Sequence, residues 1–70
     1  MPTIVANGKP RDVPEGSTIA DLLEAVGWKP QWVVVECNGE AVERSAFADG
    51  RLGEGDTLEI VRAVAGGAAP

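Results

Sequence analysis

The chain contains no histidine and only one cysteine, Cys37, among its 70 residues. Without histidine it lacks the commonest general base and the commonest metal ligand of proteins. A single cysteine can form neither an internal disulfide nor a thiolate metal site, which agrees with a reducing, cytoplasmic location. The nucleophile-elbow, phosphate-loop and dinucleotide-binding glycine patterns are also missing. We therefore expect a protein that is not an enzyme and that binds no metal and no cofactor of its own.

Basic residues and long apolar runs are scarce as well. Six lysines and arginines face 11 aspartates and glutamates, so the formal charge is −5. This balance disfavours nucleic acid and anionic membranes as partners and permits attraction to a basic protein surface. No segment approaches the length of a transmembrane helix, and the N-terminus does not resemble a signal peptide. A chain of this length is expected to form one domain, with a core too small to enclose a deep catalytic pocket.

Two Asn-Gly pairs, at residues 7–8 and 38–39, are typical of tight hairpin turns. Pro10 cannot donate a hydrogen bond to a neighbouring strand, so its strand is expected at a sheet edge. The expected strands span residues 3–6 and 9–13 around the first turn, and residues 33–37 and 40–44 around the second.

The stretch "STIADLLEAVG" predicts a helix over residues 19–26. Thr18 followed by Asp21 is typical of a capping box, with Ser17 as a competing cap, and Gly27 is well placed to end the helix. Apolar residues recur at helical spacing and should be buried against a sheet. They are Ile19, Leu22, Leu23 and Val26.

The second half of the chain is expected to add a proline loop, "WKPQW", a brief helical turn at "SAFAD" capped by Ser45, and a last strand over residues 57–64. In that strand Leu58 and Ile60 should face inward, opposite Glu59 and Val61. An initial hairpin, one covering helix and further strands indicate an α+β arrangement. A ubiquitin-like β-grasp has this order, with its first and last strands parallel at the centre of a mixed sheet of four to five strands. Different small α+β folds fit the order too.

Several side chains carry competing interpretations. Cys37 shares the alternating face of Val33 and Val35, which favours a small core side chain over a reactive thiol. Trp28 and Trp32 flank the proline loop, either packing at an edge or forming an exposed contact patch. The turn carboxylates "GEGD" and Asp49 are more often solvated than bound to a cation, so no metal site is predicted. They include Glu54 and Asp56.

The C-terminal stretch "VRAVAGGAAP" places Gly66-Gly67 directly after the last expected strand. Because glycine lacks a Cβ atom, such a tail is thin enough to enter a narrow enzyme channel. Composition alone is equally compatible with a frayed terminus that has no function. We expect a domain over residues 1–65 followed by a flexible diglycine tail over residues 66–70.

The stretches "EGSTIADLLEAVG", "VVVECNGEAVERSAFA" and "LGEGDTLEIVRAVAGG" resemble the sulfur-carrier proteins of the ThiS family, relatives of the molybdopterin-synthase small subunit. The resemblance covers the chain up to Gly67, and its most specific part is Gly55-Asp56, the hydrophobic strand and Gly66-Gly67. It implies a β-grasp fold. It also implies that a partner of the ThiF or MoeB type uses ATP to adenylate the carboxylate of Gly67. A sulfur donor such as a cysteine desulfurase then leaves a thiocarboxylate there, which donates sulfur to a ThiG-like thiazole synthase for thiamine.

Val64, Ala65 and Gly66 would thread the channel of the adenylating enzyme. The partner-facing surface is expected to include the outward positions of the last strand, Glu59, Val61 and Ala63, because Val61 is apolar yet lies on the same side as Glu59. Alternatively, the same carrier could supply sulfur for cysteine, molybdopterin or a specialised metabolite. Two functions of a different class also fit the sequence: a ubiquitin-like modifier of lysines and a pure interaction module.

This chain departs from the family pattern after the diglycine. Ala68-Ala69-Pro70 follow Gly67, which leaves Gly67 in a peptide bond with no free carboxylate. A protease, often zinc-dependent in this wider family, is expected to remove the extension. Trp32 also stands where a polar residue is expected, which affects the partner surface.

Overall fold

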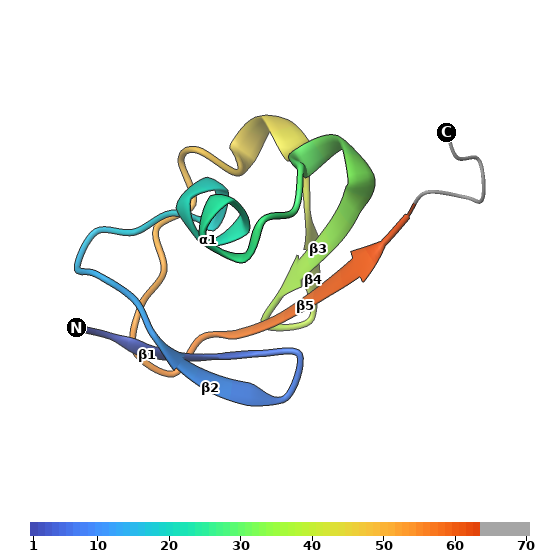
Figure 1. Ribbon diagram of the computed structural model, residues 1–70. Helices are drawn as coiled ribbons and strands as arrows, with labels where there is room; N and C mark the ends of the chain where they lie inside the picture. Colours follow the sequence, from blue (N-terminus) through green and yellow to red (C-terminus); the bar gives the residue numbers. More distant parts are fainter. Residues whose placement is uncertain (64–70) are drawn as a thin grey trace.

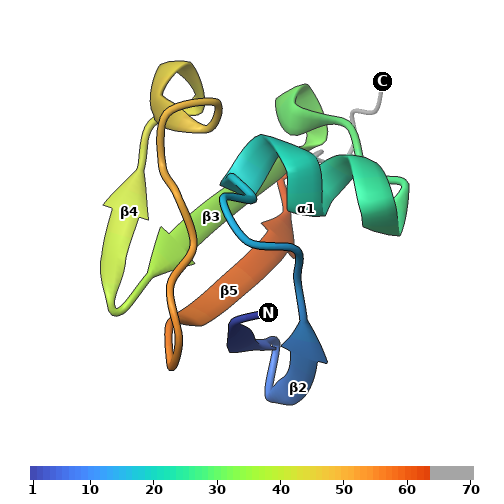
Figure 2. The same cartoon turned by 90° about the vertical axis from the view of Figure 1, so that its left-hand side faces the viewer.

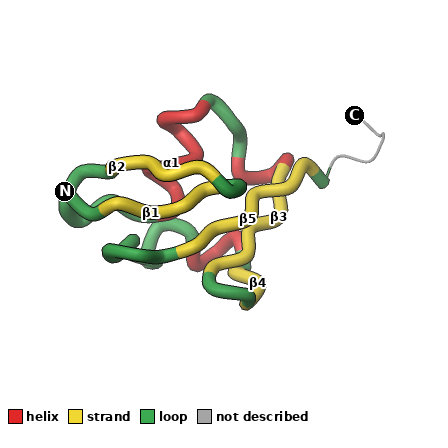
Figure 3. The backbone as a smooth tube through the Cα atoms, turned by 90° about the horizontal axis from the view of Figure 1, so that it is seen from below, coloured by secondary structure: helices red, strands yellow, loops and turns green. Residues whose placement is uncertain are grey.

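The computed structural model describes residues 1–63, which fold into a five-stranded mixed sheet with a helix packed on one face (Figure 1). The strands are β1 (Thr3–Ala6), β2 (Lys9–Asp12), β3 (Val33–Cys37), β4 (Glu40–Val42) and β5 (Thr57–Arg62), and the helix is α1 (Ile19–Val26). The order across the sheet is β2-β1-β5-β3-β4 (Figure 3). The first and last strands are parallel neighbours at its centre, so the expected β-grasp arrangement is confirmed.

Both Asn-Gly turns form hairpins. Asn7 and Asn38 each adopt a φ of 53°, and the glycine after each also has a positive φ, as a tight primed turn requires. Pro10 lies in β2 at the sheet edge, as expected. β2 ends at Asp12, one residue earlier than predicted, and β4 ends at Val42, two residues earlier.

Helix α1 begins and ends where the sequence predicts. Thr18 and Asp21 form the full capping box: the Asp21 N–H donates to Thr18 Oγ1 at 3.2 Å, and the Thr18 N–H donates to Asp21 Oδ2 at 3.0 Å. Gly27 ends the helix with a φ of 82°. Ser17, the competing cap, is buried beside the helix instead. Within residues 1–63 no helix is long and apolar enough to cross a membrane.

The core lies between α1 and the sheet (Figure 2). Ile19, Leu22 and Leu23 are buried in it, but Val26 is 38% exposed, so the prediction for Val26 is wrong. Val26 lies in the last turn of α1 and faces a groove that β2 lines from the other side, and every residue of β2 is exposed. The core comprises Ile4, Val13, Ile19, Leu22, Leu23, Val33, Val35, Phe47, Leu52, Leu58 and Ile60.

Two short 3-10 helices, η1 (Pro30–Trp32) and η2 (Arg44–Ala46), lie between the larger elements. The proline loop was expected without helical structure, whereas η1 makes one tight turn with the proline at its start, where a missing N–H costs nothing. The expected turn at "SAFAD" is η2, which starts earlier. Ser45 lies inside η2 rather than capping it, because Glu43 occupies the cap position.

Candidate functional site

Strand β5 has a paired neighbour on each side, β1 at its start and β3 from Leu58 to Arg62, which makes it the anchor for the residues that follow it in the chain. It pairs with β1 in parallel and with β3 in an antiparallel register from Cys37↔Leu58 to Val33↔Arg62. On the β1 side, the Asn7 N–H donates to the Leu58 carbonyl at 2.9 Å. The site therefore starts from a fixed central strand rather than from a loop.

The Asn7 side chain extends this support beyond the end of β1. Its Oδ1 accepts a hydrogen bond from the Ile60 N–H at 2.7 Å, and its Nδ2 donates to the Ile60 carbonyl at 3.1 Å. The amide thus takes the place of one more residue of strand β1. The sequence shows Asn7 only as a turn residue, so this second role was not predicted.

The last described residues of the chain are tied to the proline loop. The Ala63 N–H donates to the Trp32 carbonyl at 2.8 Å, beyond the last residue of β5. Trp32 is 38% exposed, and the Lys29 Nζ lies 5.7 Å from the centroid of its ring, within cation–π range. Trp28 packs against the core, whereas Trp32 is an exposed aromatic side chain beside the end of β5.

The sheet face opposite α1, here called the outer face, carries an exposed apolar pair. Val34 of β3 and Val61 of β5 are directly opposite each other, with 48% and 57% of their surfaces exposed. Glu59 is exposed as well, so the predicted outward direction of Glu59 and Val61 along β5 is confirmed; Ala63, just after β5, is exposed. Val34 was not predicted, because its place beside Val61 depends on the pairing register of two distant strands.

A second cross-strand pair on the outer face is acidic. Glu36 of β3 lies directly opposite Glu59 of β5, and both are exposed. Like charges facing each other across two strands are destabilising. A basic partner surface would relieve this repulsion, and the neighbouring valines would pack against its apolar part.

The acidic turn before β5 has a structural role. Asp56 accepts hydrogen bonds from the Gly53 N–H at 2.8 Å and from Asn38 Nδ2 at 3.1 Å, and Glu54 Oε1 accepts one from the Thr3 N–H at 2.9 Å. Gly55, with a φ of 85°, makes the turn that brings these groups together. In the part of the chain that the structure describes, no three His, Cys, Asp or Glu side chains are placed to hold a metal ion.

Cys37 is a partly buried side chain packed against the core, in agreement with its alternation with Val33 and Val35. Burial raises the pKa of its thiol, and the nearby carboxylates of Asp56 and Glu40 raise it further. Because the thiolate is the reactive form, this environment makes Cys37 a poor nucleophile.

The predicted tail residues Val64, Ala65, Gly66 and Gly67 lie outside the described residues, as does the extension after them. The structure does describe the elements that hold the chain just before the tail, which are β5, the Asn7 side chain and the Trp32 carbonyl. The predicted partner-facing residues lie on β5 and just after it, so they lead directly to the point from which the tail continues.

The ThiS family model matches residues 4–67, which is most of the chain. The chain belongs to the ThiS family. The resemblance in the sequence motifs is thereby confirmed, and the match ends at Gly67. Proteins of this family are carriers rather than catalysts, so membership agrees with the expectation that this chain is not an enzyme.

Solved structures give the same result for the fold of this ThiS-family chain. The crystal structure of the thiamine biosynthesis protein ThiS from Geobacter metallireducens has a TM-score of 0.78 at 35% identity, over 93% of this chain and 99% of that one. The NMR structure of a thiamine biosynthesis protein from the same organism has a TM-score of 0.74 at 34% identity, over 97% and 91% of the two chains.

Curated relatives fall into two kinds. The chain is 38% identical over 61 residues to the sulfur carrier protein ThiS of Thermus thermophilus, covering 87% of this chain and 94% of that protein. It is 36% identical over 64 residues to a thiazole synthase of Magnetococcus marinus, covering 91% of this chain but 20% of the synthase. A thiazole synthase of Paramagnetospirillum magneticum matches over the same shares at 38% identity. The chain therefore spans about a fifth of the length of these two synthases.

Proposed function

We propose that this protein is the sulfur carrier of thiamine biosynthesis and acts in the cytoplasm, with its sulfur held as a thiocarboxylate on Gly67. The observation that carries the proposal is the family match, which runs over residues 4–67 and ends at the second glycine of the pair. The likeness to the Thermus sulfur carrier over 94% of that protein's length supports the same assignment.

The chemistry needs only a carboxylate from the carrier. In a partner enzyme of the ThiF or MoeB type, an oxygen of the Gly67 carboxylate attacks the α-phosphorus of ATP, and pyrophosphate leaves. The acyl adenylate is a good electrophile, so the outer sulfur of a persulfide on a donor such as a cysteine desulfurase attacks its carbonyl carbon, and AMP leaves. A second thiol of the partners then breaks the S–S bond of the resulting acyl disulfide. This releases the thiocarboxylate and leaves the donor sulfur in a disulfide. The catalytic groups belong to the partners, which fits a chain without histidine and with a thiol of raised pKa.

The extension after the diglycine requires a processing step. Gly67 is joined to Ala68 in the chain, so it offers an amide carbonyl where adenylation needs a carboxylate oxygen. We assign the removal of Ala68-Ala69-Pro70 to a protease, with zinc-dependent enzymes as candidates. The family match leaves these three residues out, which supports a boundary at Gly67.

The outer face is the proposed docking surface for the adenylating enzyme. It combines the exposed Val34–Val61 pair with the Glu36–Glu59 pair and leads directly to Ala63. An apolar centre bordered by acidic groups matches a partner surface with an apolar patch and basic neighbours. Docking there would place the residues after Ala63, including Val64, Ala65 and Gly66, toward the channel of the enzyme.

The proposed acceptor of the sulfur is a thiazole synthase. Two proteins with that name contain a stretch similar to nearly the whole of this chain, within a sequence about five times as long. A carrier-like segment in the same polypeptide as the synthase supports a working partnership between the two, because covalent linkage raises their effective concentration.

The test is ATP–pyrophosphate exchange by the ThiF-type enzyme of the same organism, with the full chain and with a version that ends at Gly67. The full chain should be inert and the shortened chain active, because a carboxylate on Gly67 exists only in the second. Gly66→Val in the shortened chain should abolish exchange, since the added side chain obstructs a narrow channel. Ala48→Val, which adds bulk at an exposed position, is the control and should leave exchange unchanged.

Equal exchange by the full and shortened chains would refute the processing step, and equal exchange by the Gly66→Val chain would refute the channel. Mass spectrometry of the protein from its native cells gives an independent check. It should show a chain ending at Gly67 in which one oxygen is replaced by sulfur. Recovery of the protein joined to lysines of other proteins would instead indicate a ubiquitin-like modifier.

A further inference from the structure

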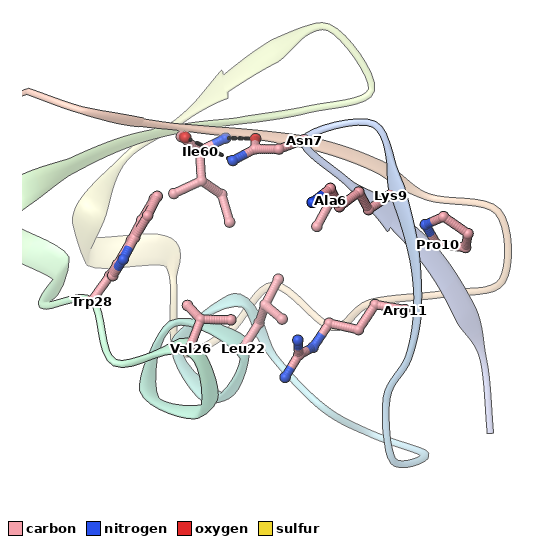
Figure 4. Close-up of a pocket in the computed structure, with 9 residues that line it drawn as sticks. All are labelled: Ala6, Asn7, Lys9, Pro10, Arg11, Leu22, Val26, Trp28 and Ile60. Carbon is pink, nitrogen blue, oxygen red and sulfur yellow. Dashed lines mark hydrogen bonds between the residues drawn. The ribbon is translucent and has the colours of Figure 1, made fainter.

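A groove between the first hairpin and the C-terminal half of α1 lies on the sheet face opposite the outer face. Its volume is about 480 Å³, within the range of ligand sites (Figure 4). Its floor and walls are apolar, with Trp28 on one side and β2 on the other. The apolar lining is Ala6, Leu22, Val26, Trp28 and Ile60.

The rim of the groove is cationic. Lys9 and Arg11 both line it from β2, and no carboxylate is among the lining residues. Because the two residues are two positions apart in a strand, their side chains leave the same face of the sheet. Figure 4 shows Arg11 reaching from β2 toward α1. In a chain with a formal charge of −5, this is a local concentration of positive charge on an apolar surface.

The remaining polar side chain of the groove is already occupied. Asn7 is committed through both its oxygen and its nitrogen to the backbone of Ile60. The groups open to a ligand are therefore the apolar floor and the two cations. Val26, the one member of the helical stripe that the core does not bury, is part of that floor.

Pro10 restricts how a ligand can approach. Ala6 and Lys9 close the two-residue turn and form a hydrogen-bonded pair, so Val5 and Pro10 form the next, non-hydrogen-bonded pair. The backbone nitrogen of Pro10 therefore points to the open edge, where it has no hydrogen to donate. This disfavours addition of a further strand to β2 and leaves the groove itself as the place for contact.

We propose that this groove binds an extended segment of a partner protein with the pattern acidic–apolar–acidic. Successive side chains of an extended segment point to opposite sides, and those two positions apart lie about 7 Å from each other. Two carboxylates at that spacing match Lys9 and Arg11, which have the same spacing on β2. The apolar side chain between them then points toward Val26 and Trp28. A single small anion lacks the second charge that this spacing accommodates.

The groove and the outer face thus differ in charge and lie on opposite sides of the sheet. The outer face suits a basic partner, and the groove suits an acidic one. Binding in the groove does not depend on the sulfur-carrier role, so its test is independent of adenylation.

The test is an NMR titration of the full 70-residue chain with a short capped peptide whose core is Glu-Phe-Glu, at low salt. Amide shifts should move in the groove, including Lys9, Arg11, Val26 and the Trp28 indole, with a Kd on the order of 1 mM for so few contacts. Arg11→Glu should weaken binding about fivefold, since one attractive pair becomes repulsive at a partly exposed site. High salt should weaken it as well.

Arg44→Glu makes the same change in net charge at an exposed position away from the groove, and it should leave the Kd within about twofold. Lys9→Glu and Val26→Ser are second variants for the rim and the floor, both at exposed positions where the fold tolerates change. Each should weaken binding, because each removes a different part of the proposed contact.

Several results would overturn the proposal. They are shifts confined to the outer face, equal binding of Glu-Ser-Glu or Lys-Phe-Lys peptides, binding of phenylacetate as tight as that of the peptide, and no shift at all. Groove shifts that depend on protein concentration without peptide would assign the groove to a second copy of this chain and would also overturn it.

Discussion

Replacing Asn7 with glycine tests whether a side chain fastens the central strand. Asn7 adopts a φ of 53°, which glycine also adopts without strain, so Asn7→Gly leaves the turn intact and removes the amide. The loss consists of two hydrogen bonds to the partly buried backbone of Ile60, of 2.7 and 3.1 Å. At about 1 kcal/mol for each bond, the two together contribute about 2 kcal/mol.

Glycine adds a further cost through the unfolded chain, whose greater freedom favours unfolding by about 0.5 kcal/mol. The free energy of unfolding should therefore fall by about 2.5 kcal/mol. For a domain of this size each 1 kcal/mol lowers Tm by about 4–8 °C, so a fall of about 10–20 °C is expected. Urea denaturation followed by tryptophan fluorescence measures the first value, and a thermal scan measures the second.

Asn38→Gly is the matched control, because Asn38 has the same φ in the same kind of turn. Its side-chain hydrogen bonds, to Asp56 and from the Thr57 N–H, are exposed and should contribute less. The Ile60 amide should also exchange with solvent faster in Asn7→Gly while the Val35 amide is unaffected. If Asn7→Gly costs no more than Asn38→Gly, the Asn7 side chain does not hold β5.

The remaining predictions concern two side chains, Cys37 and Glu59. Folding raises the pKa of Cys37, so the unfolded chain loses its thiol proton first as the pH rises. The contribution of this group to the free energy of unfolding is therefore present below the ordinary thiol pKa of about 8.5 and is lost as the pH rises above it. The midpoints of urea denaturation at pH 7 and pH 10 should therefore differ less in Cys37→Ala than in the unaltered chain. Cys37→Ala should also still form the Gly67 thiocarboxylate, because the proposed sulfur is held on a carboxylate and not on a thiol. Loss of the thiocarboxylate in a folded Cys37→Ala chain would contradict the assignment. Glu59→Gln should raise the free energy of unfolding by about 0.5 kcal/mol by ending its repulsion with Glu36, and Glu59→Lys should slow association with the adenylating enzyme in stopped-flow experiments. An unchanged association rate would exclude this face.

The parts of the fold that the sequence predicts correctly are those with local signals. The Asn-Gly turns and the capping box of α1 each depend on residues within a few positions of one another. Val26 shows the limit of such signals. Its helical spacing predicts the direction in which the side chain points. Whether the side chain is buried there depends on whether the sheet extends under the last turn of the helix, and this is set by the position of β2.

The candidate site likewise contains residues that a local pattern predicts and residues that depend on distant pairing. Alternation along β5 predicts that Glu59 and Val61 face outward, and both do. Their opposite partners, Glu36 and Val34, follow from the register between β3 and β5, which no local pattern contains. The second role of Asn7 depends on a residue 53 positions away, so a sequence pattern at the turn has no means of showing it.

The central position of β5 also determines how the molecule responds to a mechanical load. A partner that pulls on the chain beyond Ala63 applies force along the axis of β5, across its perpendicular hydrogen bonds with β3 and its slanted ones with β1. Bonds loaded in this direction must shear together, whereas a strand peeled from an edge loses its bonds one at a time. β1 and β5 are parallel neighbours near the two ends of the domain, so tension between those ends loads the hydrogen bonds of this pair in shear. Forced unfolding depends on the unfolding rate, and a shear-loaded centre keeps that rate low under a load on the chain beyond Ala63.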